Sequence, residues 1–226
     1  MIVCHRHRFI FINTRKTSGA RIETALAQFC ADDDLVTRLS TTNGSIQARA
    51  NGTIGLTRYR PVDWLRLMVR GERARLDKHL SAVGIRDLVG PEVWGSYFKF
   101  CVERDPWEKA IALYDQRTRD RKPRPTLAQF LAETRPESLS NFGLYSIDGG
   151  LAVDRMIRHE HLDTELEAVR NLLNLPAPIT LDVAPARASH YSSAIGATER
   201  ALIDAACVRE IELFGYAFSE VAPDDR

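Results

Sequence analysis

A short polar segment near the N-terminus combines the residue types that bind phosphate. Residues 15–19 read Arg-Lys-Thr-Ser-Gly and follow the apolar run Phe-Ile-Phe-Ile at 9–12, and apolar residues recur at helical spacing from residue 20 onward. A loop between a buried strand and a helix start offers backbone N–H groups to an anion, and the helix dipole favours negative charge there. The pattern predicts an anion-binding loop in which Lys16 adds a point charge.

The same five residues also fit an ordinary strand-to-helix turn with a solvated lysine. A Walker A loop, G-x-x-x-x-G-K-[ST], would be more specific for nucleotide phosphates, and the chain has none. Both interpretations stay open at the level of this motif.

A second segment repeats the strand–loop–helix pattern. Residues 97–102 read Tyr-Phe-Lys-Phe-Cys-Val, and Asp105 and Pro106 then supply an N-cap and a proline at the first helical position. Glu108 stands where a capping box places its acid, and the helix should continue through Tyr114. Two such units indicate an α/β fold.

The two segments together resemble the sulfotransferase-2 family. Residues 9–23 resemble its 5′-phosphosulfate segment, P-K-T-G-G-T-S-[IF], and residues 97–114 resemble its 3′-phosphate segment, F-x-F-V-R-[ND]-P-[WY]-D-R-x-[VL]-S-x-Y. The tail is similar to the family as well, at 153–162 and at 211–218. The resemblance thus covers most of the chain in the right order.

The resemblance implies a P-loop-like, three-layer α/β fold with a central, mostly parallel sheet flanked by helices. It implies a sulfotransferase that moves a sulfuryl group from 3′-phosphoadenosine-5′-phosphosulfate (PAPS) to a hydroxyl acceptor, a carbohydrate or another small molecule. The transfer would be an in-line displacement that releases PAP. The length and the lack of a linker predict one domain over residues 1–226.

The family motifs assign roles to individual residues of this chain. Lys16 would contact the 5′-phosphosulfate, including its bridging oxygen, and would stabilise charge on the departing phosphate. The backbone amides of Thr17, Ser18 and Gly19 would cradle the same group. Arg104 would hold the 3′-phosphate, since a guanidinium suits tetrahedral oxyanions.

A hydroxyl acceptor must lose its proton during transfer, and a histidine with a near-neutral pKa suits that task. Residues 78–82, Lys-His-Leu-Ser-Ala, resemble the K-H-x-[ST]-A element of similar bacterial enzymes, which makes His79 the implied base. A helix-capping or surface histidine is the alternative. Arg187 lies in a stretch that resembles the segment closing over the nucleotide, and is a further candidate contact.

Four positions in the donor-binding segments depart from the family pattern. The usual proline before the lysine is Arg15, the usual Thr-Ser pair is Ala20-Arg21, and the expected serine eight residues after Arg104 is Ala112. The two arginines could replace lost hydrogen bonds with charge. The same departures fit a non-catalytic relative that binds PAP, another nucleotide or a glycan. A small P-loop kinase is the third hypothesis.

Other charged clusters receive structural interpretations. Arg158 and Glu160 are expected to brace the fold or the nucleotide. Successive residues of a strand point to opposite faces, so Glu160 would point away from His159 and His161, which argues against a metal site at 159–161. The basic run at 117–124 fits a solvated face, with an anionic acceptor as the alternative.

Composition excludes several classes of protein. The 226 residues carry a net charge of +1, so no global field attracts nucleic acid or an anionic membrane. No run approaches the ~18 apolar residues of a membrane span. Four dispersed cysteines without C-x-x-C spacing predict neither a metal site nor a disulfide framework, and reduced thiols suggest the cytoplasm.

The remaining elements are predicted from periodicity and caps. Helices are expected at 81–89, 126–134, 163–174 and 198–214, a strand at 151–157 and a long loop at 40–60. Thr126 and either Asp163 or Thr164 are the expected N-caps, and Gly90 followed by Pro91 should end the first of these helices.

Overall fold

The computed structural model describes residues 1–31, 34–37, 77–181, 191 and 194–218, and its centre is a five-stranded sheet. The strand order is β3-β1-β2-β4-β7. The strands are β1 (Ile2–Cys4), β2 (Phe9–Ile12), β3 (Leu35–Val36), β4 (Phe98–Glu103) and β7 (Arg155–Arg158). The loop expected at 40–60 and Arg187 lie outside the described residues.

Most strands of this sheet run in one direction. Strand β2 pairs in parallel with β4, with Phe9 opposite Phe98, and β4 pairs in parallel with β7, with Phe100 opposite Arg155. Strand β1 is antiparallel to both of its neighbours, β2 and β3. The carboxyl ends of β2, β4 and β7 therefore meet at one edge of the sheet.

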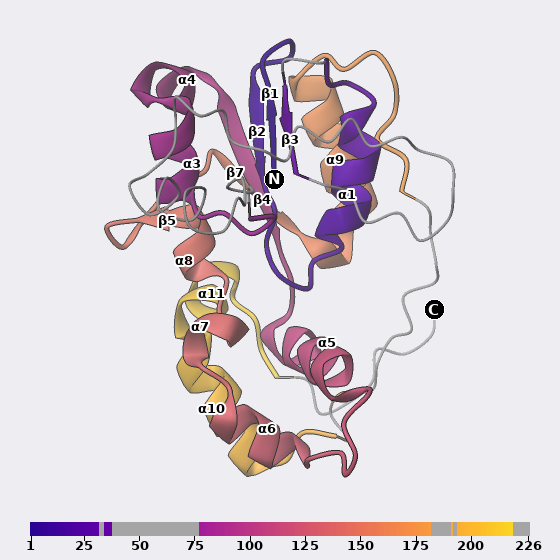
Figure 1. Ribbon diagram of the computed structural model, residues 1–226, viewed down its shortest axis with the longest axis vertical. Helices are drawn as coiled ribbons and strands as arrows, with labels where there is room; N and C mark the ends of the chain where they lie inside the picture. The colour runs from indigo at the N-terminus through magenta and orange to yellow at the C-terminus, as the bar shows by residue number, and fades with distance from the viewer. Residues whose placement is uncertain (32–33, 38–76, 182–190, 192–193, 219–226) are drawn as a thin grey trace, which may run out of the picture.

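Helices cover both faces of the sheet and form a group beyond its carboxyl edge (Figure 1). Helices α1 and α9 lie on one face, and α3 and α4 lie on the other. The helices are α1 (Gly19–Ala27), α3 (Ala82–Val89), α4 (Pro91–Ser96), α5 (Pro106–Thr118), α6 (Leu127–Glu133), α7 (Pro136–Leu139), α8 (Phe142–Tyr145), α9 (Leu162–Leu172), α10 (Ala197–Ala206) and α11 (Val208–Phe214). A short hairpin joins β5 (Ser146–Ile147) to β6 (Gly150–Leu151).

Alternation along β2 explains why the sheet is buried on both sides. Phe9 and Phe11 enter the core shared with α1 and α9, whereas Ile10 and Ile12 enter the core shared with α3. All four side chains are fully buried. The prediction of a strand covered on both faces, and of a mixed α/β fold with a mostly parallel sheet, is confirmed.

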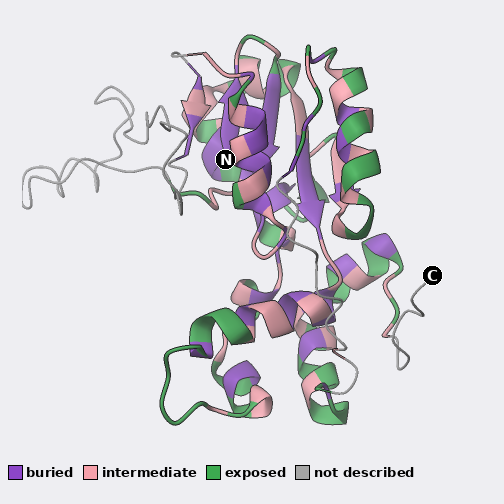
Figure 2. Ribbon diagram, turned by 90° about the vertical axis from the view of Figure 1, so that its right-hand side faces the viewer, coloured by how far each residue is buried: buried purple, intermediate pink, exposed green. Residues whose placement is uncertain are grey.

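A third apolar cluster holds the helical group together, visible as buried segments in the lower part of Figure 2. Trp107 and Leu113 of α5 pack with Phe130 of α6 and Ile203 of α10. Because α5 starts immediately after β4, this cluster fixes the helical group beside the carboxyl edge of the sheet.

Several local predictions are confirmed. Asp105 caps α5 by accepting from the backbone N–H groups of Trp107 and Glu108. Thr126 caps α6 in a capping box with Gln129, and Gly90, at φ 87°, ends α3.

Other local predictions are wrong in part. Residues 198–214 form two helices separated at Cys207, and α9 begins at Leu162, so neither Asp163 nor Thr164 caps it. The strand expected at 151–157 is β7 at Arg155–Arg158, and the sequence pattern missed β1 and α4. None of the helices in the described ranges has the length and apolar character needed to cross a bilayer.

Candidate functional site

Three chain segments meet where β2, β4 and β7 end. Residues 13–18, called the phosphate loop below, follow β2; Arg104 and Asp105 follow β4; and the short 3-10 helix His159–His161 follows β7. Ligands of parallel α/β sheets bind at this edge, outside the carboxyl ends of the strands.

The backbone of the phosphate loop has the geometry of an anion-binding nest. Lys16 and Ser18 both have φ 61°, in the left-handed region, and Thr17 between them does not. Alternating handedness turns successive N–H groups toward one side, which forms a concavity for an anion. Left-handed conformations are costly for residues other than glycine, so their presence at two positions points to a function.

Side-chain bonds hold the loop in this shape. The buried Thr17 bonds through Oγ1 to Thr14 Oγ1 at 2.8 Å, and Thr14 donates to the carbonyl of Val102 in β4. Gly19 begins α1, and a Cβ there would overlap the buried Asn13 side chain. The hydroxyl of Thr17 is thus engaged inside the loop.

Helix α1 begins with uncapped backbone N–H groups. Its N-cap, Ser18, makes no side-chain cap, because its Oγ bonds to His159 Nε2 at 2.9 Å instead. The first N–H groups of a helix have no partner within the helix. Together with the nest, they give the loop a set of donors directed at the same space.

Asn141, between α7 and α8, holds the backbone of the phosphate loop at Arg15 through two hydrogen bonds. Arg15 N donates to Asn141 Oδ1 at 3.0 Å, and Asn141 Nδ2 donates to Arg15 O at 3.1 Å. Asn141 is fully buried, and its Nδ2 also donates to Glu103 Oε1 at 3.2 Å. One amide therefore connects the loop after β2 to the end of β4.

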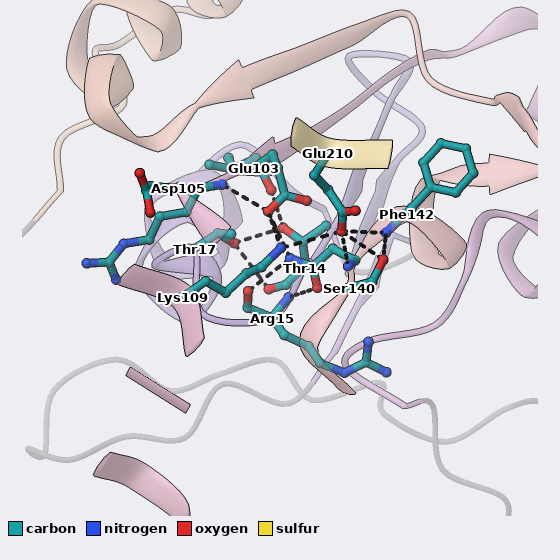
Figure 3. Close-up of polar contacts among 12 residues, drawn as sticks. Thr14, Arg15, Thr17, Glu103, Asp105, Lys109, Ser140, Phe142 and Glu210 are labelled. Carbon is teal, nitrogen blue, oxygen red and sulfur yellow. Dashed lines mark hydrogen bonds and ion pairs between the residues drawn. The ribbon is translucent and has the colours of Figure 1, made fainter. Parts of the chain in front are cut away.

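A buried ion network supports this clamp (Figure 3). Lys109 Nζ lies 2.8 Å from Glu103 Oε1 and 3.5 Å from Glu210 Oε1, and all three side chains are buried. Glu210 Oε1 in turn accepts from Asn141 N at 2.7 Å. Burial raises the pKa of Glu103, and Lys109 opposes that shift. The network joins β4, α5 and α11 behind the phosphate loop.

Lys16 lies among other cations. Its pKa is lowered to about 8, by burial first and then by the charges of Lys78, Arg104, Arg117 and Arg119. A lysine in this position is surrounded by positive charge that an anion would neutralise. This surplus is what a site for a multiply charged phosphate compound requires.

Arg104 has a partner that the sequence did not predict. Its Nε and Nη2 lie 3.0 and 2.9 Å from Glu108 Oε2. Glu108 therefore does not complete a capping box, and Asp105 N donates to Glu160 Oε1 at 2.8 Å instead. A phosphate at Arg104 would share the guanidinium with this carboxylate.

His79 is oriented by the phosphate loop itself. Its Nδ1 lies 2.8 Å from the carbonyl oxygen of Asn13. A carbonyl only accepts, so Nδ1 carries the proton and the neutral ring has its lone pair on Nε2. Burial lowers the pKa of His79, and the charges of Lys78 and Arg15 act in the same direction. The lowered pKa favours the neutral ring, which is the form that can accept a proton.

His159 is a second neutral histidine at the site. Burial, with the nearby charges of Arg104 and Arg21, lowers its pKa to about 4. It lies in a 3-10 helix, not on the strand expected there. Arg21 lies in the first turn of α1, and its charge acts on the His159 ring, while Ala20 is exposed on the same turn.

The remaining predicted residues are less central. Ala112 is half-buried on α5, two turns from Arg104, and contributes no polar group. Arg158 donates to Phe214 O, and Glu160 accepts from Tyr216 OH at 3.2 Å as well as from Asp105 N. These last contacts join β7 to the end of α11, in keeping with a bracing role.

Two cysteines that are far apart in sequence come together elsewhere. Ligand atoms of Cys4, Cys30 and Asp34 lie within 4.8 Å of one another. Both thiols are free, and both carboxylate oxygens of Asp34 accept backbone N–H groups, from His5 and from Ala31. The spacing of the cysteines in the sequence did not predict this cluster. The hydrogen bonds of Asp34 join the end of β1 to the loop before β3, so we interpret the cluster as a structural brace.

Sequence reasoning missed the residues that position the site. No local signal marks Asn141, which meets Arg15 across 126 residues of sequence. His159 could have been found, because it follows a predicted strand whose carboxyl end lies at the ligand-binding edge.

No protein-family model, curated protein or solved structure matches this chain. Its function must be inferred from the site.

Proposed function

We propose that this protein is a PAPS-dependent O-sulfotransferase with a P-loop-like fold. The observation that carries the proposal is the meeting of two strand–loop–helix units on neighbouring parallel strands, with Lys16 in one loop and Arg104 in the other. These are the two segments that resemble the phosphosulfate and 3′-phosphate segments of sulfotransferases. Adjacent strands bring their loops within reach of one nucleotide.

The phosphate loop suits the phosphosulfate end of the donor. The nest formed around Lys16 and Ser18 would receive the 5′-phosphate, and Lys16 would neutralise charge that develops on the bridging oxygen. The cations around Lys16 favour a ligand with several negative charges. Arg104 would hold the 3′-phosphate, in competition with Glu108.

His79 would accept the proton of the acceptor hydroxyl. The acceptor oxygen attacks sulfur, the new O–S bond forms, the S–O bond to the 5′-phosphate breaks, and the hydroxyl proton passes to His79 Nε2. The Asn13 carbonyl holds the ring in the tautomer that this step needs. The departing group is PAP, stabilised by Lys16 and the loop N–H groups.

Transfer of labelled sulfate from PAPS to a panel of hydroxyl compounds tests this proposal. We expect transfer from PAPS and none of phosphate from ATP with Mg²⁺. His79→Ala should lower kcat about 10²- to 10⁴-fold while PAP affinity is preserved. Phosphate transfer from ATP would instead identify a kinase. PAP binding without transfer to any acceptor would identify a non-catalytic binding protein.

A further inference from the structure

A pocket of about 450 Å³ opens beside the phosphate loop, within the size range of small-molecule sites. We call it the α7–α8 pocket. Its lining residues are Arg15 of the phosphate loop, Pro136 and Glu137 of α7, Ser140 after that helix, Gly143 and Leu144 of α8, and Ala206 at the end of α10. The pocket shares Arg15 with the donor site and is otherwise formed by the helical group.

Two polar side chains of this lining make hydrogen bonds within the protein. Ser140 Oγ donates to Glu210 Oε1 at 2.8 Å and accepts from Phe142 N at 3.1 Å. Arg15 Nη1 donates to the carbonyl of Glu137 at 3.3 Å. The exposed carboxylate of Glu137 also lines the pocket, whereas the side chains of Pro136, Leu144 and Ala206 offer no hydrogen bonds. Against these apolar residues, a ligand with many hydroxyls would lose bonds to water without replacing them.

Arg15 also connects the pocket to the proposed chemistry. Asn141 holds its backbone on both sides, and Lys16 is the next residue. Its side chain extends away from the ion network (Figure 3). Its positive charge is close enough to His79 to help lower the pKa of that ring. A molecule in the pocket would therefore lie against the residue that directly precedes Lys16 in the phosphate loop.

We propose that the α7–α8 pocket binds the acceptor, and that the acceptor is an alcohol or phenol with an apolar body and few hydroxyl groups. This inference rests on the proposed sulfotransferase function and narrows its acceptor from any hydroxyl compound. The apolar body lies against Pro136, Gly143, Leu144 and Ala206, while the hydroxyl faces the phosphate loop. These four residues offer no side-chain hydrogen bonds to a polyhydroxylated sugar.

The chain offers a matched pair of variants for the test. A Cβ at Gly143, in α8, meets nothing within 4 Å, and neither does a Cβ at Gly95, in α4. Neither glycine has a positive φ. Gly143→Leu therefore extends a side chain from a lining residue that has room for a Cβ, and Gly95→Leu makes the same change on a short helix elsewhere. Ala206→Phe enlarges a second lining residue, on α10.

The test is calorimetric binding of 2-naphthol and of N-acetylglucosamine to the full chain, with and without saturating PAP. We expect naphthol to bind with Kd below about 1 mM and more tightly than the sugar. Gly143→Leu should weaken naphthol at least tenfold and leave PAP affinity unchanged, and Gly95→Leu should change neither. Ala206→Phe should repeat the effect of Gly143→Leu.

Three results would overturn the inference: no naphthol binding, tighter binding of the sugar, or equal naphthol affinity in wild type and Gly143→Leu. These outcomes are separate from failure of the proposed function. That failure would appear as absence of PAP binding, whereas naphthol binding to the protein without PAP still tests the pocket.

Discussion

Lys16 owes its lowered pKa first to burial and then to the positive charges around it. It lies half-buried in a left-handed conformation, and four other cations act on its charge. An ammonium in such surroundings releases its proton more easily than an exposed lysine. A bound anion reverses this effect, because it favours the charged form.

Affinity for PAP should therefore depend on pH through Lys16. Its pKa is about 8 in the free protein, and a phosphate beside it raises that value, so binding above pH 8 takes up a proton. Between about pH 7.5 and 9.5, where the phosphates themselves no longer titrate, affinity should fall by up to about tenfold per pH unit. Calorimetry across this range measures the slope.

Lys16→Arg is the control, because a guanidinium stays protonated throughout the range. The affinity of the Lys16→Arg protein for PAP should not change across this pH range. An equally steep profile in Lys16→Arg would assign the titration to another group.

The pairing of Arg104 with Glu108 leads to a second prediction. A carboxylate 2.9 Å from the guanidinium competes with a phosphate for the same donors. Glu108→Gln should therefore raise PAP affinity about three- to tenfold in calorimetric titrations. Glu167→Gln removes the partner of Arg170 on α9 and should have no effect. Weaker PAP binding in Glu108→Gln would mean that Glu108 orients Arg104 for the ligand.

The sequence predicted residues whose roles depend on local geometry. Asp105 caps α5 because it stands directly before Pro106, and Lys16 lies in a loop that follows a recognisable strand. The capping-box pattern also predicted a partner for Glu108, but Arg104 lies one turn away and carries the opposite charge. Where two local bonds are available, the sequence does not show which one forms.

At the scale of elements, the phosphate loop is held from two directions. Thr14 ties it to β4, and Asn141 ties it to the turn between α7 and α8. The left-handed residues inside the loop need this support, since their conformation is unfavourable in isolation. The helical group thus shapes a loop that belongs to the sheet.

Asn141→Ala should weaken both the fold and the site. It leaves the N–H and C=O of Arg15 without their partner and removes a donor to the buried Glu103. We expect a loss of about 2–3 kcal/mol in the free energy of unfolding and at least tenfold weaker PAP binding. Asn171→Ala, on the exposed side of α9, should change neither.

Denaturant unfolding and PAP titration at a temperature where both variants stay folded measure the two effects separately. PAP affinity equal to that of wild type in a folded Asn141→Ala protein would show that the loop keeps its shape without the clamp.

At the scale of the whole molecule, the parallel strands determine where the candidate site lies. Strand β2 was predicted because a continuous apolar run marks a strand buried on both faces, and β4 because residues 97–102 begin a second strand–loop–helix pattern. Their adjacency brings Lys16 and Arg104 to one edge, although 88 residues separate them in sequence. The clamp by Asn141, the ion network through Lys109 and the α7–α8 pocket depend on packing across long sequence separations. No pattern of spacing contains that information.

The central claim is that two loops hold opposite ends of one nucleotide. Calorimetric titration with PAP, 3′-AMP and 5′-AMP tests it most directly, because the two monophosphates each lack one end. We expect PAP to bind with one-to-one stoichiometry and at least tenfold more tightly than either monophosphate, and Lys16→Ala to lower PAP affinity toward that of 3′-AMP. PAP binding no tighter than 5′-AMP, or no binding at about 1 mM, would contradict it.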